Sequence, residues 1–152
     1  MFMWHEIESI EHSARNFPTL KAATDVLNGY ICTINANGEV AAPAAASTAL
    51  YVAINDLQGD DHNVEGAMIP AGSPLNLYDL AAWDGREMIA TESNITTAMG
   101  SISVGDTLKA DANGKLSKTG VATIVTFKVI DKIMIGGVAG VRVKVVKGSA
   151  ST

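Results

Sequence analysis

The chain has 152 residues, of which 47% are hydrophobic and only 18% are charged, and its formal net charge is −5. This length suits a single domain with one continuous core, and the apolar content excludes an intrinsically disordered chain. The negative net charge argues against a protein whose main task is to neutralise nucleic-acid phosphates, because that task needs clustered Lys and Arg.

The charges are unevenly distributed along the chain. Residues 1–105 contain three basic and thirteen acidic side chains, and residues 106–152 contain eight basic and three acidic ones, so the two portions carry about −10 and +5. Opposite poles can steer copies of the chain into head-to-tail or side-by-side association. Neutralisation within one monomer is the alternative interpretation.

The opening segment has the period of an amphipathic helix or arm. Apolar residues recur at spacings of three and four between acidic ones, and Pro18 should end the pattern. A helix of this length is marginal alone, so its apolar face must pack on its own domain or on another molecule. We favour an arm that reaches out to a partner. Its apolar residues are Phe2, Met3, Trp4, Ile7, Ile10, Ala14 and Phe17.

From about residue 26 the pattern changes to short β-strands. Runs rich in β-branched residues alternate with Gly, Asn, Asp and Pro, as in sandwiches and barrels. In the last run Val141, Val143 and Val145 alternate with Arg142 and Lys144, so one face should be buried and the other wet. The predicted strands are 30–34, 50–54, 75–80, 102–109, 121–130 and 141–146.

A weak internal repeat relates the two halves of the chain. Gly29 corresponds to Gly105 at an offset of 76 residues, and two further segment pairs match in the same register. Each half reads as strand, Asn-Gly turn, short strand, loop and strand, and Asn-Gly favours a tight turn because both residues tolerate positive φ. Two related β-units are the simplest account, and chance similarity of two hairpins is the alternative. The matching segments are 36–40 with 112–116 and 51–55 with 127–131.

Together these elements predict a mainly β chain. We expect a small β-sandwich or β-barrel made of two related β-units, with an N-terminal arm or short helix. The expected organisation is an arm over residues 1–25, a β-domain over 26–147 and a C-terminal tail over 148–152. No stretch reaches the roughly 20 apolar residues that span a bilayer, so the chain should be soluble.

The sequence contains little that could perform catalysis, and we predict no enzyme. Cys32 lies in an apolar strand, where a lone cysteine usually serves as a small buried hydrophobe. His5 and His12 have no cysteine near them, and His62 lies in an acidic loop without the spacing of a calcium loop. The glycine-rich run 136–140 precedes a strand, which indicates a hairpin loop instead of a dinucleotide site. We expect no metal and no cofactor.

Aromatic residues are too few to form a stacking platform for nucleic-acid bases. Phe127 is the only aromatic residue in the basic third of the chain. Trp83 lies in a predicted loop, where it could contact a carbohydrate, although such a residue more often fills a core or a subunit contact. We assign Trp83 to a subunit contact.

The strand-and-turn pattern resembles the small β-proteins that decorate the heads of tailed phages, and related head-fibre bases. The likeness lies in a Gly-Asp pair, a strand, an Asn-Gly turn, a second strand and a Phe-x-Val strand, together with low charge and a free N-terminal arm. It extends over about residues 26–147. The segments that carry it are 103–108, 111–116, 127–130 and 140–145.

This resemblance implies a structural virion protein on the capsid exterior, made in the host cytoplasm. Such a protein binds the major capsid protein as a homo-oligomer, commonly a trimer, and stabilises the shell, with neither nucleic acid nor membrane as a partner. Two alternatives are a tail-tube or other ring-forming virion β-protein, and a ligand- or carbohydrate-binding β-module. We expect the capsid or subunit interface to contain Phe2, Met3, Trp4, Ile7, Ile10, Phe17 and Trp83.

Overall fold

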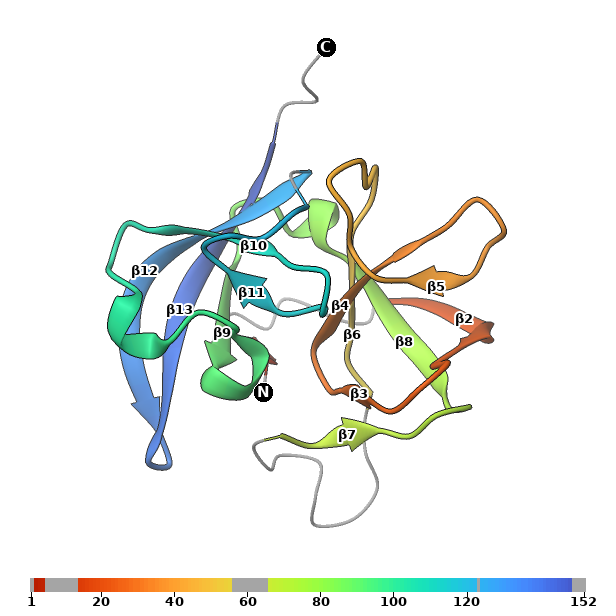
Figure 1. Cartoon of the computed structure of the whole chain (residues 1–152), viewed down its shortest axis with the longest axis horizontal. Helices are drawn as coiled ribbons and strands as arrows, with labels where there is room; N and C mark the ends of the chain where they lie inside the picture. Colours follow the sequence, from red (N-terminus) through yellow and green to blue (C-terminus); the bar gives the residue numbers. More distant parts are fainter. Residues whose placement is uncertain (1, 5–13, 56–65, 123, 149–152) are drawn as a thin grey trace.

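A computed structural model describes residues 2–4, 14–55, 66–122 and 124–148. Within these ranges the chain forms thirteen β-strands and three short 3-10 helices, and it contains no α-helix. The strands form two antiparallel sheets that lie beside each other, and a small two-stranded ribbon (Figure 1). The prediction of a mainly β chain built from two β-units is confirmed.

The first β-unit is a five-stranded antiparallel sheet that curls into a nearly closed barrel, with the strand order β2-β8-β6-β4-β5. A ribbon of β3 and β7 lies at its lower end in Figure 1. The strands of the sheet are β2 (Ala14–Lys21), β4 (Tyr30–Ile34), β5 (Val40–Ala41), β6 (Tyr51–Ala53) and β8 (Pro74–Asp79), and those of the ribbon are β3 (Val26–Leu27) and β7 (Met68–Ile69).

The second β-unit is a six-stranded antiparallel sheet with the order β1-β9-β13-β12-β10-β11. Three 3-10 helices flank β9, and Asp79 caps the first by accepting a hydrogen bond from the Ala81 N–H. The strands are β1 (Phe2–Trp4), β9 (Glu87–Thr91), β10 (Thr107–Ala110), β11 (Leu116–Ser117), β12 (Val125–Ile135) and β13 (Val138–Lys147), and the helices are η1 (Leu80–Trp83), η2 (Glu92–Asn94) and η3 (Met99–Ser101).

The repeat predicted from the sequence is present in the backbone. Gly29 and Gly105 have φ angles of 93° and 92°, and each N–H donates to a strand carbonyl at 2.8 Å, on Ala53 and Val129 respectively. The pairings β4–β6 and β4–β5 recur as β10–β12 and β10–β11 in the same register at the 76-residue offset. Chance similarity does not produce this agreement, because a slip of one residue would invert every side chain.

The correspondence extends to the whole five-stranded plan. The order β2-β8-β6-β4-β5 of the first unit is repeated as β9-β13-β12-β10-β11 in the second. In each unit the first strand pairs with the last one, and the last strand also pairs with a middle strand, which is β6 in the first unit and β12 in the second. The two units therefore share one five-stranded antiparallel plan, and β1 is added to the second unit at the edge of β9.

The core of the chain consists of two hydrophobic clusters. One fills the barrel of the first unit. The other lies between the units, where the outer face of the first packs on the inner face of the second. Barrel residues include Leu20, Ala22, Cys32, Ala53, Ile69, Leu75 and Leu77. The second cluster includes Ile31, Leu50, Val52, Trp83, Met88, Leu108, Phe127, Val129, Val141, Val143 and Val145.

Hydrogen bonds also join the units, in addition to this apolar contact. The Ile31 N–H donates to the Gly114 carbonyl at 2.9 Å, and the Asn94 side-chain amide donates to the Asn28 carbonyl at 3.2 Å. A buried backbone group without a partner is costly, so each bond fixes how the turns of one unit meet the strands of the other.

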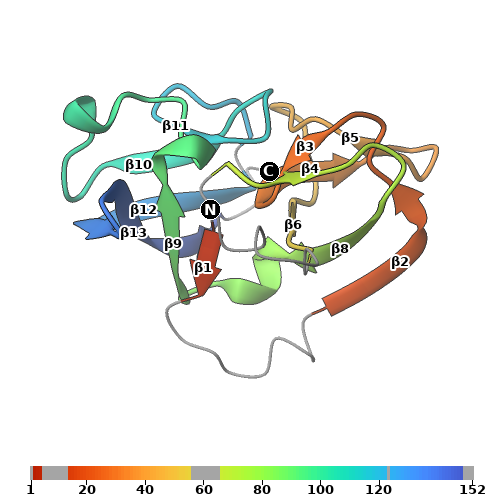
Figure 2. The same cartoon turned by 90° about the horizontal axis from the view of Figure 1, so that it is seen from below.

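The sequence predicted an arm or a short helix at the N-terminus, and the described residues of this segment form strands instead of a helix. Phe2–Trp4 form β1, which pairs with β9, and Ala14–Lys21 form β2, which pairs with β8 (Figure 2). Pro18 lies within β2 instead of ending a helix, and an edge strand tolerates proline because one side of its backbone needs no partner. The apolar spacing of three and four residues was misleading here, because these segments form backbone hydrogen bonds with neighbouring strands.

Several finer predictions are confirmed. Val141, Val143 and Val145 are fully buried, and Lys144 between them is exposed. Cys32 is a buried hydrophobe. The glycine-rich run contains the turn of the β12–β13 hairpin, although its last three residues belong to β13. The strand β9 was not predicted, because Glu87–Thr91 has no alternation that its sequence makes evident.

Candidate functional site

Catalytic groups do not converge in the described part of the chain. No three His, Cys, Asp or Glu side chains there could hold a metal ion together. Cys32 is fully buried, and burial raises the pKa of its thiol to about 12. A thiol needs its thiolate form to act as a nucleophile, so this cysteine is inert near neutral pH. His5, His12 and His62 lie outside the described residues.

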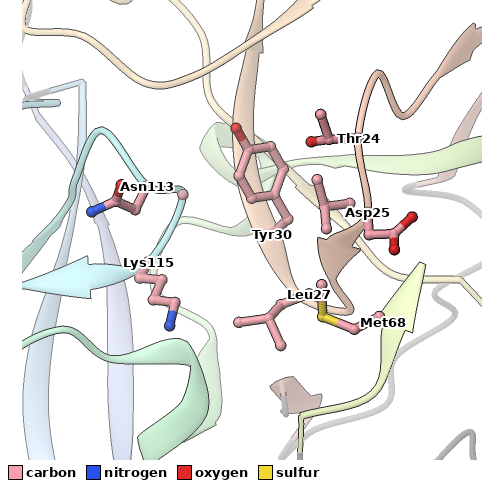
Figure 3. Close-up of a pocket in the computed structure, with 9 residues that line it drawn as sticks. Thr24, Asp25, Leu27, Tyr30, Met68, Asn113 and Lys115 are labelled. Carbon is pink, nitrogen blue, oxygen red and sulfur yellow. The ribbon is translucent and has the colours of Figure 1, made fainter. Parts of the chain in front are cut away.

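A cleft of about 280 Å³ lies where the two units meet. Figure 3 shows Asn113 and Lys115, from the β10–β11 turn, on one side, and Thr24 and Asp25, before β3, on the other. Tyr30 stands between them. Apolar side chains complete the lining, so the cleft has both polar and apolar lining residues. The lining residues are Thr24, Asp25, Val26, Leu27, Tyr30, Met68, Asn113, Gly114 and Lys115.

The cleft wall depends on one close contact between the units. Gly114 has a φ of 71°, and a Cβ at this position would overlap the Tyr30 ring and lie 2.7 Å from the Ile31 carbonyl oxygen. Burial raises the pKa of Tyr30, and electrostatic interactions with Cys32 and Asp111 raise it further. The phenol is therefore neutral at physiological pH and can donate or accept a hydrogen bond, but it cannot act as a base.

The outer face of the six-stranded sheet is the most distinctive surface of the described chain. Strand alternation places Lys128 of β12 opposite Lys144 of β13, and both are exposed. Lys109 of β10 and Arg142 of β13 lie on the same face. Each is two residues along its strand from the row that contains Lys128 and Lys144, in opposite directions. We call these four residues the basic face.

Among the described residues, acidic side chains lie beside the part of the basic face formed by Arg142 and Lys144, and Glu87 of β9 is the cross-strand neighbour of Lys144. The guanidinium of Arg142 lies 3.7 Å from a Glu87 carboxylate oxygen and 3.9 Å from one of Asp131. The register places Lys128 and Lys144 opposite each other, and like charges in that position destabilise a strand pair. The repulsion between these two lysines lowers the stability of the sheet. A role in binding would explain why both lysines are present.

The interface residues predicted from the sequence are not brought together. Phe2, Met3 and Trp4 form β1, whose backbone pairs with β9 of the same chain, and Phe17 lies in β2 of the other sheet. Residues 2–4 and 14–21 are therefore strands of the two sheets. Ile7 and Ile10 lie outside the described residues.

Trp83, which the sequence analysis assigned to a subunit contact, lies in the core of the chain. Its side chain is only 2% exposed and belongs to the cluster between the units, where its ring lies 5.4 Å from the ring of Tyr78. The 3-10 helix η1 turns the chain sharply after β8, so a residue that looks like part of a loop points into the core.

The basic face was missed, although two signals for it were visible. The last strand alternates valines with Arg142 and Lys144, and residues 106–152 carry an excess of positive charge. What the sequence did not show is that β10, β12 and β13 are adjacent in the sheet, which places Lys109 and Lys128 beside them.

Comparisons with known proteins identify no relative. No family model matches the chain, and neither a curated protein nor a solved structure is significantly similar to it. Among the described residues, no helix has the length and apolar character needed to cross a bilayer. Arguments about function therefore depend on the residues and their geometry.

Proposed function

We propose that this chain is a structural virion protein that binds the outer surface of a tailed-phage capsid and stabilises the shell. The observation that carries the proposal is the basic face. It lies on the side of the second unit that faces away from the first, and no described residue covers it. The likeness of the strand-and-turn pattern to head decoration proteins points to the same class of protein.

Electrostatics and mass action supply the mechanism. A positive sheet face complements an acidic protein surface, and complementary charge speeds encounter and fixes orientation. A ligand that binds only the assembled shell stabilises that state in proportion to its occupancy. In this proposal the partner is the major capsid protein, and the chain acts on the capsid exterior as a homo-oligomer, with a trimer as our first choice.

The proposed anchor moves from the N-terminal arm to the basic face. Deleting residues 1–17 would remove β1 and half of β2, so it would disturb both sheets as well as any anchor. Charge reversal at the basic face is a cleaner test, because Lys128 is exposed and its side chain has no role in the core.

The test is co-sedimentation of the purified chain with empty heads of the phage that encodes it. We expect saturable binding, an increase in the temperature at which the heads disrupt, and weaker binding as salt is raised. Lys128→Glu should weaken binding at least tenfold. Lys21→Glu is the matched control, since Lys21 is exposed on β2 and away from the basic face, and it should bind like the wild type.

Failure of the wild-type chain to bind heads would overturn the proposal. Equal losses for the two charge reversals would show that net charge, and not the basic face, controls binding. The ring-forming alternative predicts self-assembly of the free chain without heads, which analytical ultracentrifugation would detect. The carbohydrate-binding alternative depended on Trp83, which is buried, and would now depend on the cleft between the units.

A further inference from the structure

The hairpin formed by β12 and β13 extends beyond its neighbours in the sheet. On one side the ladder with β10 ends at Thr107 opposite Lys128, and on the other side the ladder with β9 ends at Thr91 opposite Gly140. The β12–β13 ladder continues to Ile135 opposite Val138. This part of the hairpin is therefore two-stranded, and both of its backbone edges lack a neighbouring strand among the described residues.

The projecting part of the hairpin is apolar. The seven residues 133–139, which we call the hairpin tip, carry no charge and no hydroxyl or amide side chain. Met134 is 67% exposed, the largest exposed fraction among the large hydrophobic residues described. Ile133, Ile135 and Val138 are half-buried. An exposed apolar run of this kind is unfavourable in a soluble domain unless it serves a function.

The base of the hairpin is held firmly. The Lys132 ammonium donates to the carbonyls of Met99 and Ile102 at 2.7 and 2.9 Å, which ties the hairpin to η3 and the segment after it. The turn consists of Gly136 and Gly137, both with positive φ, as a tight two-residue hairpin requires. A rigid projection loses little conformational entropy when it binds, which favours affinity.

A shallow groove runs beneath the tip. It has a volume of about 280 Å³, and Met99 on η3 faces Met134 and Ala139 on the hairpin across it. Two methionines at such a surface can adapt their shape to a partner, because the side chain is unbranched and polarisable. Apart from Lys132, the residues that line the groove are apolar or glycine.

The described β6–β8 ladder of the first unit matches one part of the β12–β13 ladder. The pairs Tyr51–Asp79, Val52–Tyr78 and Ala53–Leu77 of β6 and β8 correspond to the β12–β13 pairs from Phe127 to Val129. The pairs between Asp131–Arg142 and Ile135–Val138 have no counterpart in the described residues of the first unit. Within the described residues, the extension is found in the second unit, which is also the unit with the basic face.

We propose that the hairpin tip inserts into an apolar groove on the outer face of the shell subunit, beside the contact made by the basic face. This inference rests on the proposed function. Charge would orient the chain at a distance, and burial of Met134 and its neighbours would then slow its release, since apolar burial mainly affects the rate of dissociation.

Two features favour a repeated protein lattice over other occupants. A stable solution dimer buries about 20–30 residues on each side, whereas the tip has seven, so a pair of copies joined by it would be weak. Many copies on a lattice can add weak contacts together. A membrane is disfavoured because interfacial hairpins insert Trp, Tyr or Phe, and the tip contains none of these.

Met134→Glu tests the proposal, with Val104→Glu as the matched control. Val104 is 62% exposed and lies in the turn before β10, away from the tip. Both variants should keep the Tm within about 2 °C of the wild type, because both side chains are mostly in solvent. We expect Met134→Glu to weaken binding to empty heads at least tenfold, mainly through faster dissociation, while Val104→Glu binds like the wild type.

Each outcome of the experiment decides the question. If the wild type binds heads and Met134→Glu binds equally well, the inference is wrong while the proposed function stands. If the wild type does not bind, the proposed function fails and the inference fails with it. If the wild type floats with vesicles of phosphatidylglycerol and phosphatidylcholine and Met134→Glu does not, the tip is a membrane anchor. If Met134→Glu instead dissociates an oligomer of the free chain, the tip is a subunit contact.

Discussion

The two β-units share one backbone plan and present opposite chemistry on the same face. Ile31 and Val52 on the outer face of the first unit are buried against the second, and their equivalents there are Thr107 and Lys128, which are exposed. Turns and inner faces are alike in both units. The difference shows that the side chains on the outer face, and not the strand plan, determine whether that face of a unit packs on the other unit or is exposed.

The charged outer face of the second unit also disfavours the stacking of a further unit on it. If the second unit had the apolar outer face of the first, it would offer a platform for a third unit, and copies of the chain could add end to end. Lysines on that face prevent apolar stacking, in the way that charged residues protect sheet edges from aggregation. The same lysines leave the face free for a partner of opposite charge.

The strongest test of the comparison exchanges the two chemistries. Val52→Lys should destabilise the chain by more than about 4 kcal/mol, because it buries an unpaired charge between the units. Lys128→Val, at the equivalent position, should change stability by less than about 0.5 kcal/mol, since that site is exposed. Urea denaturation followed by tryptophan fluorescence measures both. Similar values for the two variants would contradict the proposed division between buried and open faces.

Equivalent glycines should also respond differently. Gly38 and Gly114 have φ angles of 78° and 71°, so alanine at either should cost about 1–2 kcal/mol from backbone strain alone. At Gly38 a Cβ would meet no atom within 4 Å, whereas at Gly114 it would overlap the Tyr30 ring. Gly114→Ala should therefore cost about 3–4 kcal/mol in total. A thermal or urea unfolding curve for each variant measures the loss of stability. Equal losses for the two variants would mean that the Tyr30 ring moves aside at little energetic cost.

Much of the fold could be predicted from local signals. The repeat, the Asn-Gly turns and the alternation in β13 depend on neighbours along the chain, and each predicted its element correctly. The N-terminal segments could not be predicted in this way, because Phe2–Trp4 and Ala14–Lys21 become strands through pairing with β9 and β8, which are distant in sequence. The burial of Trp83 could not be predicted for the same reason, since it depends on how η1 turns toward the other sheet.

The candidate site was harder to predict than the fold. Strand alternation identified Arg142 and Lys144 as exposed, but the basic face exists only because β10, β12 and β13 are adjacent, and sequence order does not specify that arrangement. The length of the β12–β13 hairpin was underestimated because the predicted strand ended at residue 130, where a shift in register interrupts the pattern. Irregular points of this kind have no reliable signal in one sequence.

The Asx turns of the two units offer a smaller contrast. Asn35 accepts hydrogen bonds from the N–H groups of Asn37 and Glu39, and Asp111 does so from those of Asn113 and Lys115. Asp111 is buried and also accepts from the Thr96 hydroxyl.

Replacing each of these turn residues by alanine should separate the two sites. Asp111→Ala should cost about 2–3 kcal/mol, because the Thr96 hydroxyl and two backbone N–H groups lose a buried, charged acceptor. Asn35→Ala should cost about 1 kcal/mol, because Asn37 and Glu39 are exposed and their N–H groups regain water. Chemical denaturation of both variants would measure the gap, and an equal cost would show that burial adds nothing to this turn.

The smallest effect concerns an ion pair at the edge of the second unit. A hydrogen bond from the Lys118 ammonium, at 2.9 Å, lowers the pKa of Asp106 below 3.8, and the Ser103 N–H adds to this. Because the folded carboxyl has the lower pKa, its contribution to stability is present above pH 3.8 and is lost as the pH falls through the folded value.

Lys118→Met should raise the pKa of Asp106 toward its ordinary value while leaving the Ser103 hydrogen bond in place. An NMR titration of the Asp106 carboxyl carbon in both proteins would measure the change. An unchanged pKa would mean that the backbone N–H, and not the ammonium, lowers it. The first unit has Tyr30 at the equivalent position, so it has no carboxyl to titrate there, and this acid-sensitive contact belongs to the second unit alone.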